Sequence, residues 1–138
     1  MSLVLDSSIA LAWIYGDETT AAIRTVFQAV ADSGALVPAL WRLEIGNSLT
    51  VAMRRGRIDA EFRRAALDDL VLLDLIIDGH TDAQVWHGTM ALADRFRLTL
   101  YDAAYLELAQ RTGLPLATLD RDLRAAAEAM GFHLLGAE

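Results

Sequence analysis

Four acidic residues stand at positions where a carboxylate is costly unless it has a function. Asp6 and Asp120 each follow a short apolar run, at residues 2–5 and 114–118. Glu44 and Asp102 lie inside apolar stretches, at residues 40–45 and 98–106. An acid in such surroundings is expensive to bury unless it is paired, hydrogen-bonded or bound to a metal. These four residues are therefore the candidates for chemistry.

Electrostatics indicates what four converging carboxylates would need. Two carboxylates about 4 Å apart repel each other by roughly 4 kcal/mol at an effective dielectric constant near 20. Such a cluster raises its own pKa values or binds a cation, and the chain has no lysine to neutralise it. Carboxylate oxygens suit Mg²⁺, or Mn²⁺ in its place. Mg²⁺ in turn suits phosphoryl chemistry, because it activates water and stabilises charge on the phosphate.

The elements that would position these acids are short apolar strands alternating with helices. Asp17 and the segment Thr81–Gln84 have the residue types that cap the helices starting near them. The pattern predicts an α/β fold of three layers, with helices on both faces of a five-stranded, mainly parallel sheet. The strands are expected at residues 2–5, 35–37, 73–77, 114–118 and 132–135, and the helices at 7–15, 18–32, 40–55, 60–72, 81–96, 100–111 and 120–130.

The predicted sheet also suggests how the acids meet. Ligands of open parallel sheets bind beyond the carboxyl ends of the strands, at the crevice where the strand order reverses. Asp6 and Asp120 come just after the first and the fourth strand. If these two strands are neighbours at that crevice, both carboxylates lie in it.

Composition narrows the class of protein. A chain of 138 residues fits a single domain. It has no apolar run long enough to span a membrane, no signal-peptide pattern at its start and no cysteine, so we expect a cytoplasmic protein. The net charge of −7 argues against general nucleic-acid binding. All 12 basic residues are arginine, however, whose planar guanidinium can bind phosphate with two hydrogen bonds.

The four acids lie in residues 3–8, 38–47, 100–109 and 116–123. In these stretches the chain resembles the PIN-domain ribonucleases, and within them the VapC-type toxins of bacterial toxin–antitoxin modules. The resemblance covers essentially the whole chain and implies one PIN-like domain over residues 1–138. It also implies a Mg²⁺-dependent endoribonuclease in which a metal-activated water attacks an RNA phosphodiester. A cognate VapB-like antitoxin and a homodimer are expected on the same ground.

The resemblance implies a role for each matched residue. Asp6 and Asp102 are expected to be the principal Mg²⁺ ligands, and Glu44 and Asp120 to bind the metal directly or through water. The supporting residues are expected to be Ser7, Asn47, Thr118 and Asp122, although helix capping explains the last equally well. Candidates for contact with RNA phosphates at the rim of the site are Arg42, Arg54, Arg55 and Arg57, although arginines at a helix C-terminus are also favourable without any ligand.

Simpler explanations remain open for the single residues. Asp6, Asp102 and Asp120 could each cap a helix, and Glu44 could be an exposed helix acid. Other classes also remain: a PIN nuclease that is not a toxin, an acid-cluster phosphatase and a binding module without activity. A dehalogenase-like phosphatase would have a second aspartate where Ser8 stands, a receiver domain would need a lysine, and a silent module would have lost some of the acids.

Overall fold

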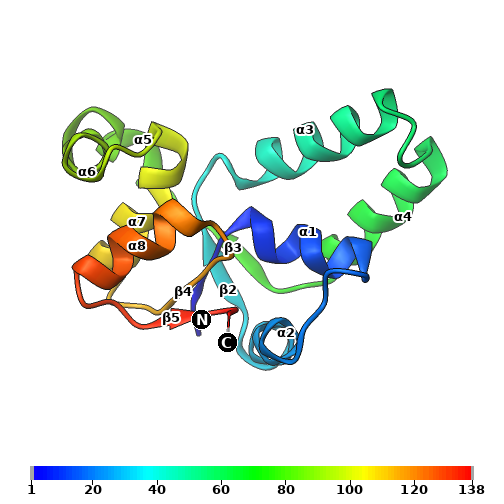
Figure 1. The fold of residues 1–138 in the computed structure, drawn as a ribbon, viewed down its shortest axis with the longest axis horizontal. Helices are drawn as coiled ribbons and strands as arrows, with labels where there is room; N and C mark the ends of the chain where they lie inside the picture. Colours follow the sequence, from blue (N-terminus) through cyan, green and yellow to red (C-terminus); the bar gives the residue numbers. More distant parts are fainter. Residues whose placement is uncertain (1, 138) are drawn as a thin grey trace.

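The computed structural model describes residues 2–137, which form one parallel sheet with helices around it (Figure 1). The sheet order is β3-β2-β1-β4-β5, and all four strand pairs within these residues are parallel. The predicted α/β fold with a mainly parallel sheet is therefore confirmed. The strands are β1 (Val4–Leu5), β2 (Ala35–Val37), β3 (Leu75–Ile77), β4 (Leu116–Ala117) and β5 (Leu134–Leu135).

The helices cover the two faces of the sheet in two groups. One group lies to the right of the sheet in Figure 1 and comprises α1 (Ser7–Tyr15), α2 (Ala21–Ser33), α3 (Trp41–Arg54) and α4 (Ala60–Val71). The other lies to the left and comprises α5 (Thr81–Gln84), the π-helical turn η1 (Val85–Thr89), α6 (Met90–Phe96), α7 (Leu100–Thr112) and α8 (Arg121–Ala129). Along the chain, β2 and β3 are added on one side of β1, and β4 and β5 are then added on its other side. Because crossovers between parallel strands are right-handed, the two directions place their helices on opposite faces. None of the helices described here is long and apolar enough to cross a membrane.

The reversal of strand order falls between β1 and β4. Val4 pairs with Leu116 and Leu5 with Ala117. The first and fourth strands are therefore neighbours, which is the condition for Asp6 and Asp120 to lie in one crevice. Asp6 and Asp120, which follow these strands, lie at the same edge of the sheet.

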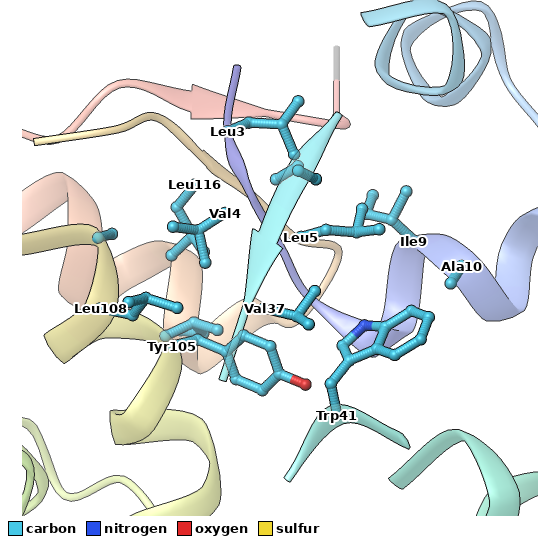
Figure 2. Packing of buried hydrophobic residues seen from close by; sticks show 14 of the residues in the cluster. Leu3, Val4, Leu5, Ile9, Ala10, Val37, Trp41, Tyr105, Leu108 and Leu116 are labelled. Carbon is cyan, nitrogen blue, oxygen red and sulfur yellow. The ribbon is translucent and has the colours of Figure 1, made fainter. Parts of the chain in front are cut away.

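The central strands are buried on both faces, which is why they read as continuous apolar runs. Figure 2 shows Val4 and Leu116 packed with Tyr105 and Leu108 of α7, whereas Ile9 of α1 lies on the other side of β1. Residues 103–109 of α7 are all buried. This helix is therefore held along much of its length by the core.

Two predictions about helix ends were wrong. The second helix begins at Ala21, and its cap is Thr20, whose hydroxyl accepts from Ile23 N at 3.2 Å; Asp17 lies in the preceding turn. Thr81 does not cap a helix, because its buried hydroxyl donates to Asp78 at 2.8 Å.

The helix expected at residues 81–96 is also broken. Its apolar spacing continues through the segment, but the backbone leaves helical geometry at His87, with φ −119° and ψ −106°. The segment is therefore divided into α5, η1 and α6.

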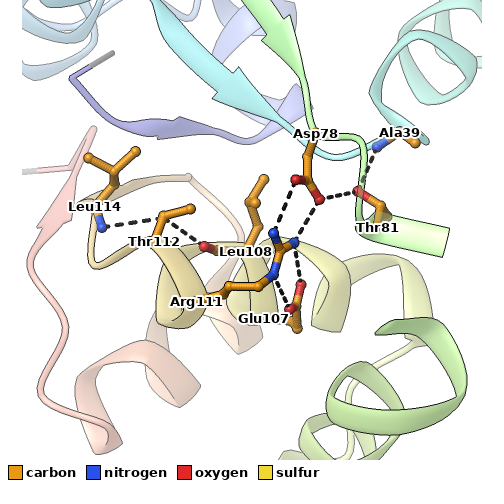
Figure 3. Close-up of polar contacts among 8 residues, drawn as sticks. All are labelled: Ala39, Asp78, Thr81, Glu107, Leu108, Arg111, Thr112 and Leu114. Carbon is orange, nitrogen blue, oxygen red and sulfur yellow. Dashed lines mark hydrogen bonds and ion pairs between the residues drawn. The ribbon is translucent and has the colours of Figure 1, made fainter. Parts of the chain in front are cut away.

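A polar cluster that the sequence did not predict ties α7 to the sheet (Figure 3). Arg111 of α7 donates two hydrogen bonds to Asp78, at 2.6 and 3.1 Å, and two to Glu107, also at 2.6 and 3.1 Å. Asp78 directly follows β3 and is buried. Burial would raise its pKa, but the hydrogen bonds from Arg111 and Thr81 lower it. We call Asp78, Thr81, Glu107 and Arg111 the arginine clamp; it joins the C-terminal end of α7 to the end of β3.

Candidate functional site

Asp6 lies at the centre of the candidate site, at the carboxyl end of β1. Its side chain is only 5% exposed and accepts hydrogen bonds from Ser8 Oγ at 2.6 Å and Thr118 Oγ1 at 2.7 Å. Burial raises its pKa, as does the charge of Asp120, while the hydroxyl donors oppose the rise. Although Asp6 occupies the N-cap position of α1, its side chain makes no capping hydrogen bond. Capping therefore does not explain this residue.

Thr118 connects two of the acids. It is fully buried after β4, and its hydroxyl donates to Asp6 while accepting from the backbone N–H of Asp120 at 3.0 Å. The predicted supporting threonine therefore lies in direct contact with the first acid and beside the fourth.

Glu44 enters the site from the first turn of α3. Its carboxylate accepts hydrogen bonds from the phenol of Tyr105 and, at 3.5 Å, from Ser7 Oγ. Burial raises the pKa of Glu44, and the charges of Asp6 and Asp102 raise it further, against the Tyr105 hydrogen bond. Glu44 is therefore half-buried beside other acids, not an exposed helix acid.

Asp102 enters from the first turn of α7. The cap of this helix is Thr99, whose hydroxyl accepts from Asp102 N at 3.1 Å, so capping does not account for the Asp102 carboxylate. Burial, together with the charges of Asp120 and Asp6, raises the pKa of Asp102 from 3.8 to about 6. Asp102 therefore lies within electrostatic reach of both.

Asp120 caps a helix and also acts electrostatically on two other acids. Its Oδ2 accepts from Leu123 N at 2.9 Å, so it caps α8 as the simpler explanation held. Its charge also acts on Asp6 and Asp102. Asp122, in the first turn of α8, is exposed and lies 3.6 Å from Arg121 Nε. Its charge adds to the raised pKa of Asp102.

The four acids thus lie within electrostatic reach of one another at one edge of the sheet, but they do not form a closed cage. Among residues 2–137, no group of three or more acidic or histidine side chains is gathered tightly enough to hold a metal ion. Hydrogen bonds from protein donors already orient the carboxylates of Asp6, Glu44 and Asp120. The donor set is nonetheless entirely carboxylate oxygen, the ligand type that Mg²⁺ and Mn²⁺ prefer.

Tyr105 is a site residue that the sequence analysis missed. Its ring is fully buried, and Figure 2 shows its hydroxyl turned out of the strand packing toward the side where Trp41 of α3 lies. Burial and the charges of Asp6 and Glu44 raise the pKa of its phenol, so it remains a hydrogen-bond donor. The sequence could have indicated this residue by its spacing, because Tyr105 follows Asp102 by three residues and so lies on the same side of α7.

The candidate arginines are divided between different surfaces. Arg55 and Arg57 line a groove of about 600 Å³ between α1 and α3, together with Asn47. Arg42 lines a separate, mostly apolar pocket of about 260 Å³ between α3, α4 and β3. Arg54 is exposed at the end of α3. The first of these surfaces adjoins the acids, because Ser8, which donates to Asp6, forms part of its wall.

The chain is similar to several known proteins. The family model for the PIN domain matches residues 3–129. The chain is 35% identical over 124 residues to Ribonuclease VapC3 of Pyrobaculum aerophilum, covering 89% of this chain and 92% of that one. The crystal structure of PAE2754 from Pyrobaculum aerophilum superposes with a TM-score of 0.64 at 24% identity, covering 91% of this chain and 86% of that one. A toxin–antitoxin complex from Klebsiella pneumoniae gives 0.59 at 17% identity, with coverages of 88% and 89%, so both structures share the fold.

Proposed function

Because the chain belongs to the PIN-domain family, and within it to the VapC type, we propose that it is a Mg²⁺-dependent endoribonuclease that acts as the toxin of a toxin–antitoxin module. The observation that carries the proposal is the meeting of Asp6, Glu44, Asp102 and Asp120 at the carboxyl edge of the sheet. Its relative from Pyrobaculum aerophilum bears the name ribonuclease, and the structure from Klebsiella pneumoniae is a toxin–antitoxin complex.

The residues fit a divalent cation. Burial and, in addition, the like charges of neighbouring acids raise the pKa values of Asp6, Glu44 and Asp102. A cation among them would relieve the repulsion that is already present. Asp6 and Asp102 are assigned as principal ligands, with Glu44 and Asp120 as the remaining acids. When bound, Mg²⁺ supplies an activated water and stabilises charge on the phosphate and the leaving oxygen.

The chain's own contribution is to hold these carboxylates in one orientation. Ser8 and Thr118 fix Asp6 through its Oδ2, and Tyr105 fixes Glu44 through its Oε1. Ligating carboxylates that are themselves hydrogen-bonded lose little freedom on binding, which favours both metal affinity and orientation. Glu44, Asp102 and Asp120 are only partly buried, so a substrate phosphate can approach their carboxylates.

RNA cleavage with and without chelator tests the proposal. We expect the wild type to cleave single-stranded RNA with Mg²⁺ or Mn²⁺ and not with EDTA. We expect Asp6→Asn and Asp102→Asn to lose cleavage while keeping a wild-type circular dichroism spectrum. Asp68→Asn, an exposed acid of α4, is the matched control and should cleave normally. Cleavage that is equal in EDTA, or that survives Asp6→Asn, would refute the assignment.

Two further assays, of phosphatase activity and of host growth, distinguish the alternative functions. A phosphatase would release phosphate from p-nitrophenyl phosphate and leave RNA intact, and a silent binding module would do neither. A nuclease without a toxin role would cleave RNA, yet its expression would not arrest growth of its host. Growth arrest that Asp6→Asn abolishes, and that a neighbouring antitoxin gene relieves, would support the full proposal.

The proposal includes a homodimer and a cognate antitoxin as partners. Val71 and Leu72 at the end of α4 are 69% and 85% exposed, and Val71 lines a pocket with Leu75 and Ile77 of β3, an edge strand of the sheet. Exposed apolar side chains beside a strand edge are typical of surfaces that another chain covers. Light scattering after size exclusion should give twice the monomer mass, and a monomer at micromolar concentration would remove the homodimer from the proposal.

A further inference from the structure

The groove between α1 and α3, which we call the α1–α3 groove, runs from Ser8, beside Asp6, to two arginines. Its inner end is formed by Ser8, which donates to Asp6, and by Leu119, whose N–H donates to Ser8 Oγ at 3.0 Å. Its outer end is formed by Arg55 and Arg57. A ligand that occupies the groove therefore has one end beside the acids and the other beside two positive charges.

The lining between these ends is mixed. Leu11 of α1 and Val51 of α3 give it apolar surface, and Asn47 and Ser48 add hydrogen-bonding side chains. The span from Ser8 to Tyr15 on α1 is seven residues, or about 10 Å at 1.5 Å per residue. A stacked strand carries one phosphate per roughly 3.4 Å of its axis, so the groove spans about three nucleotides.

Arg57 is held in position before any ligand arrives. Its guanidinium carbon lies 4.1 Å from the centre of the Tyr15 ring, which stacks on Phe62 with ring centres 6.2 Å apart. Glu18 contacts Arg57 at 3.6 Å, but both side chains are about half exposed, at 49% and 53%. Exposed ion pairs of this kind contribute little stability, so a phosphate can replace Glu18.

We propose that the α1–α3 groove holds the single RNA strand on one side of the cleaved bond, with Arg55 and Arg57 contacting its phosphates. This rests on the proposed ribonuclease function and adds the path of the substrate. The overall charge of −7 makes such local contacts necessary, because the rest of the surface repels RNA. Aligned on Tyr15, Arg57 loses little freedom when it binds phosphate.

The test measures binding apart from cleavage. Fluorescence anisotropy with a labelled single-stranded RNA of about 12 nucleotides, within the usual site sizes of single-strand binders, is measured on Asp102→Asn protein with Mg²⁺. Arg55→Gln and Arg57→Gln are each expected to weaken binding about five-fold at about 0.1 M salt, and to reduce the slope of log affinity against log salt by about 0.7. Glu18→Gln is expected to tighten binding, because it removes a negative charge and releases Arg57.

The controls are Arg24→Gln on α2 and Arg64→Gln on α4, which make the same change of charge at exposed positions outside the groove. If Arg55→Gln and Arg57→Gln bind RNA as the controls do, the path is refuted even though the protein is a ribonuclease. If those two variants instead lose affinity only for a polyglutamate peptide, the groove belongs to an acidic protein segment. If the parent protein binds no RNA at any salt concentration, the proposed function fails together with the path.

Discussion

Replacing Asp102 by asparagine should stabilise the protein at neutral pH in the absence of divalent metal. Because the pKa of Asp102 is raised from 3.8 to about 6, the folded chain holds this proton more tightly than the unfolded chain. The wild type therefore loses stability as the pH rises from about 4 to about 6. Asparagine does not ionise, so the variant avoids that loss.

The magnitude follows from the size of the shift. About two pKa units correspond to about 3 kcal/mol as an upper limit. Asp102 is only half-buried, so solvent screening reduces the expected gain to about 1–2 kcal/mol. With an unfolding entropy near 2.1 cal/mol/K per residue, a chain of this size should show a rise in Tm of roughly 3–7 °C.

Thermal unfolding in EDTA measures this gain, with Asp68→Asn as the control for loss of an exposed carboxylate. The Tm difference between Asp102→Asn and wild type should be present at about pH 7.5 and vanish below about pH 3, where the Asp102 carboxyl is neutral in both the folded and the unfolded chain. Mg²⁺ at 100 times its Kd should then stabilise the wild type by about 2.7 kcal/mol and reverse the order. A variant that is less stable than wild type at neutral pH, or a difference independent of pH, would refute the reasoning.

Three further predictions concern the residues that support the site and the fold. Tyr105→Phe removes the phenol donor but keeps the ring, so Mg²⁺ affinity measured by calorimetry should fall about tenfold; an unchanged affinity would contradict its positioning role. Arg111→Met leaves the buried Asp78 carboxylate without its cation and should lower the free energy of unfolding in urea by about 3 kcal/mol; adding Asp78→Asn should recover part of this, and no recovery would argue against the ion pair. Gly34→Ala should cost about 1–3 kcal/mol, because φ is +72° and the new Cβ would lie 2.7 Å from a backbone oxygen. Gly56→Ala, with the same φ and open space, should cost less in the same urea titration, and equal losses would exclude the clash.

Much of the architecture was predictable because the central strands are buried on both faces. Their apolar runs stand out from the helices, and an acid that directly follows such a run marks its carboxyl end. This was enough to place Asp6 and Asp120 at one edge of the sheet. The pairing of Val4 with Leu116 confirmed that β1 and β4 adjoin.

The rest depended on contacts between segments that are far apart in sequence. Tyr105 reaches Glu44 across 61 positions, and Arg111 reaches Asp78 across 33. Local spacing carries no information about such pairs. The break at His87 was equally hidden, because the apolar period continues through it while the backbone does not.

The placement of the four acids has a consequence for how the protein is made. The β3-β2-β1 half of the sheet and its helices provide Asp6 and Glu44, whereas α7 and the end of β4 provide Asp102 and Asp120. Neither half has the full set, and the last acid is synthesised 114 residues after the first. At ordinary elongation rates of about 5–20 residues per second, a ribosome takes roughly 6 to 23 seconds over that interval. A nascent chain would therefore be inactive until both halves have joined, and two separately expressed halves would act only where they meet.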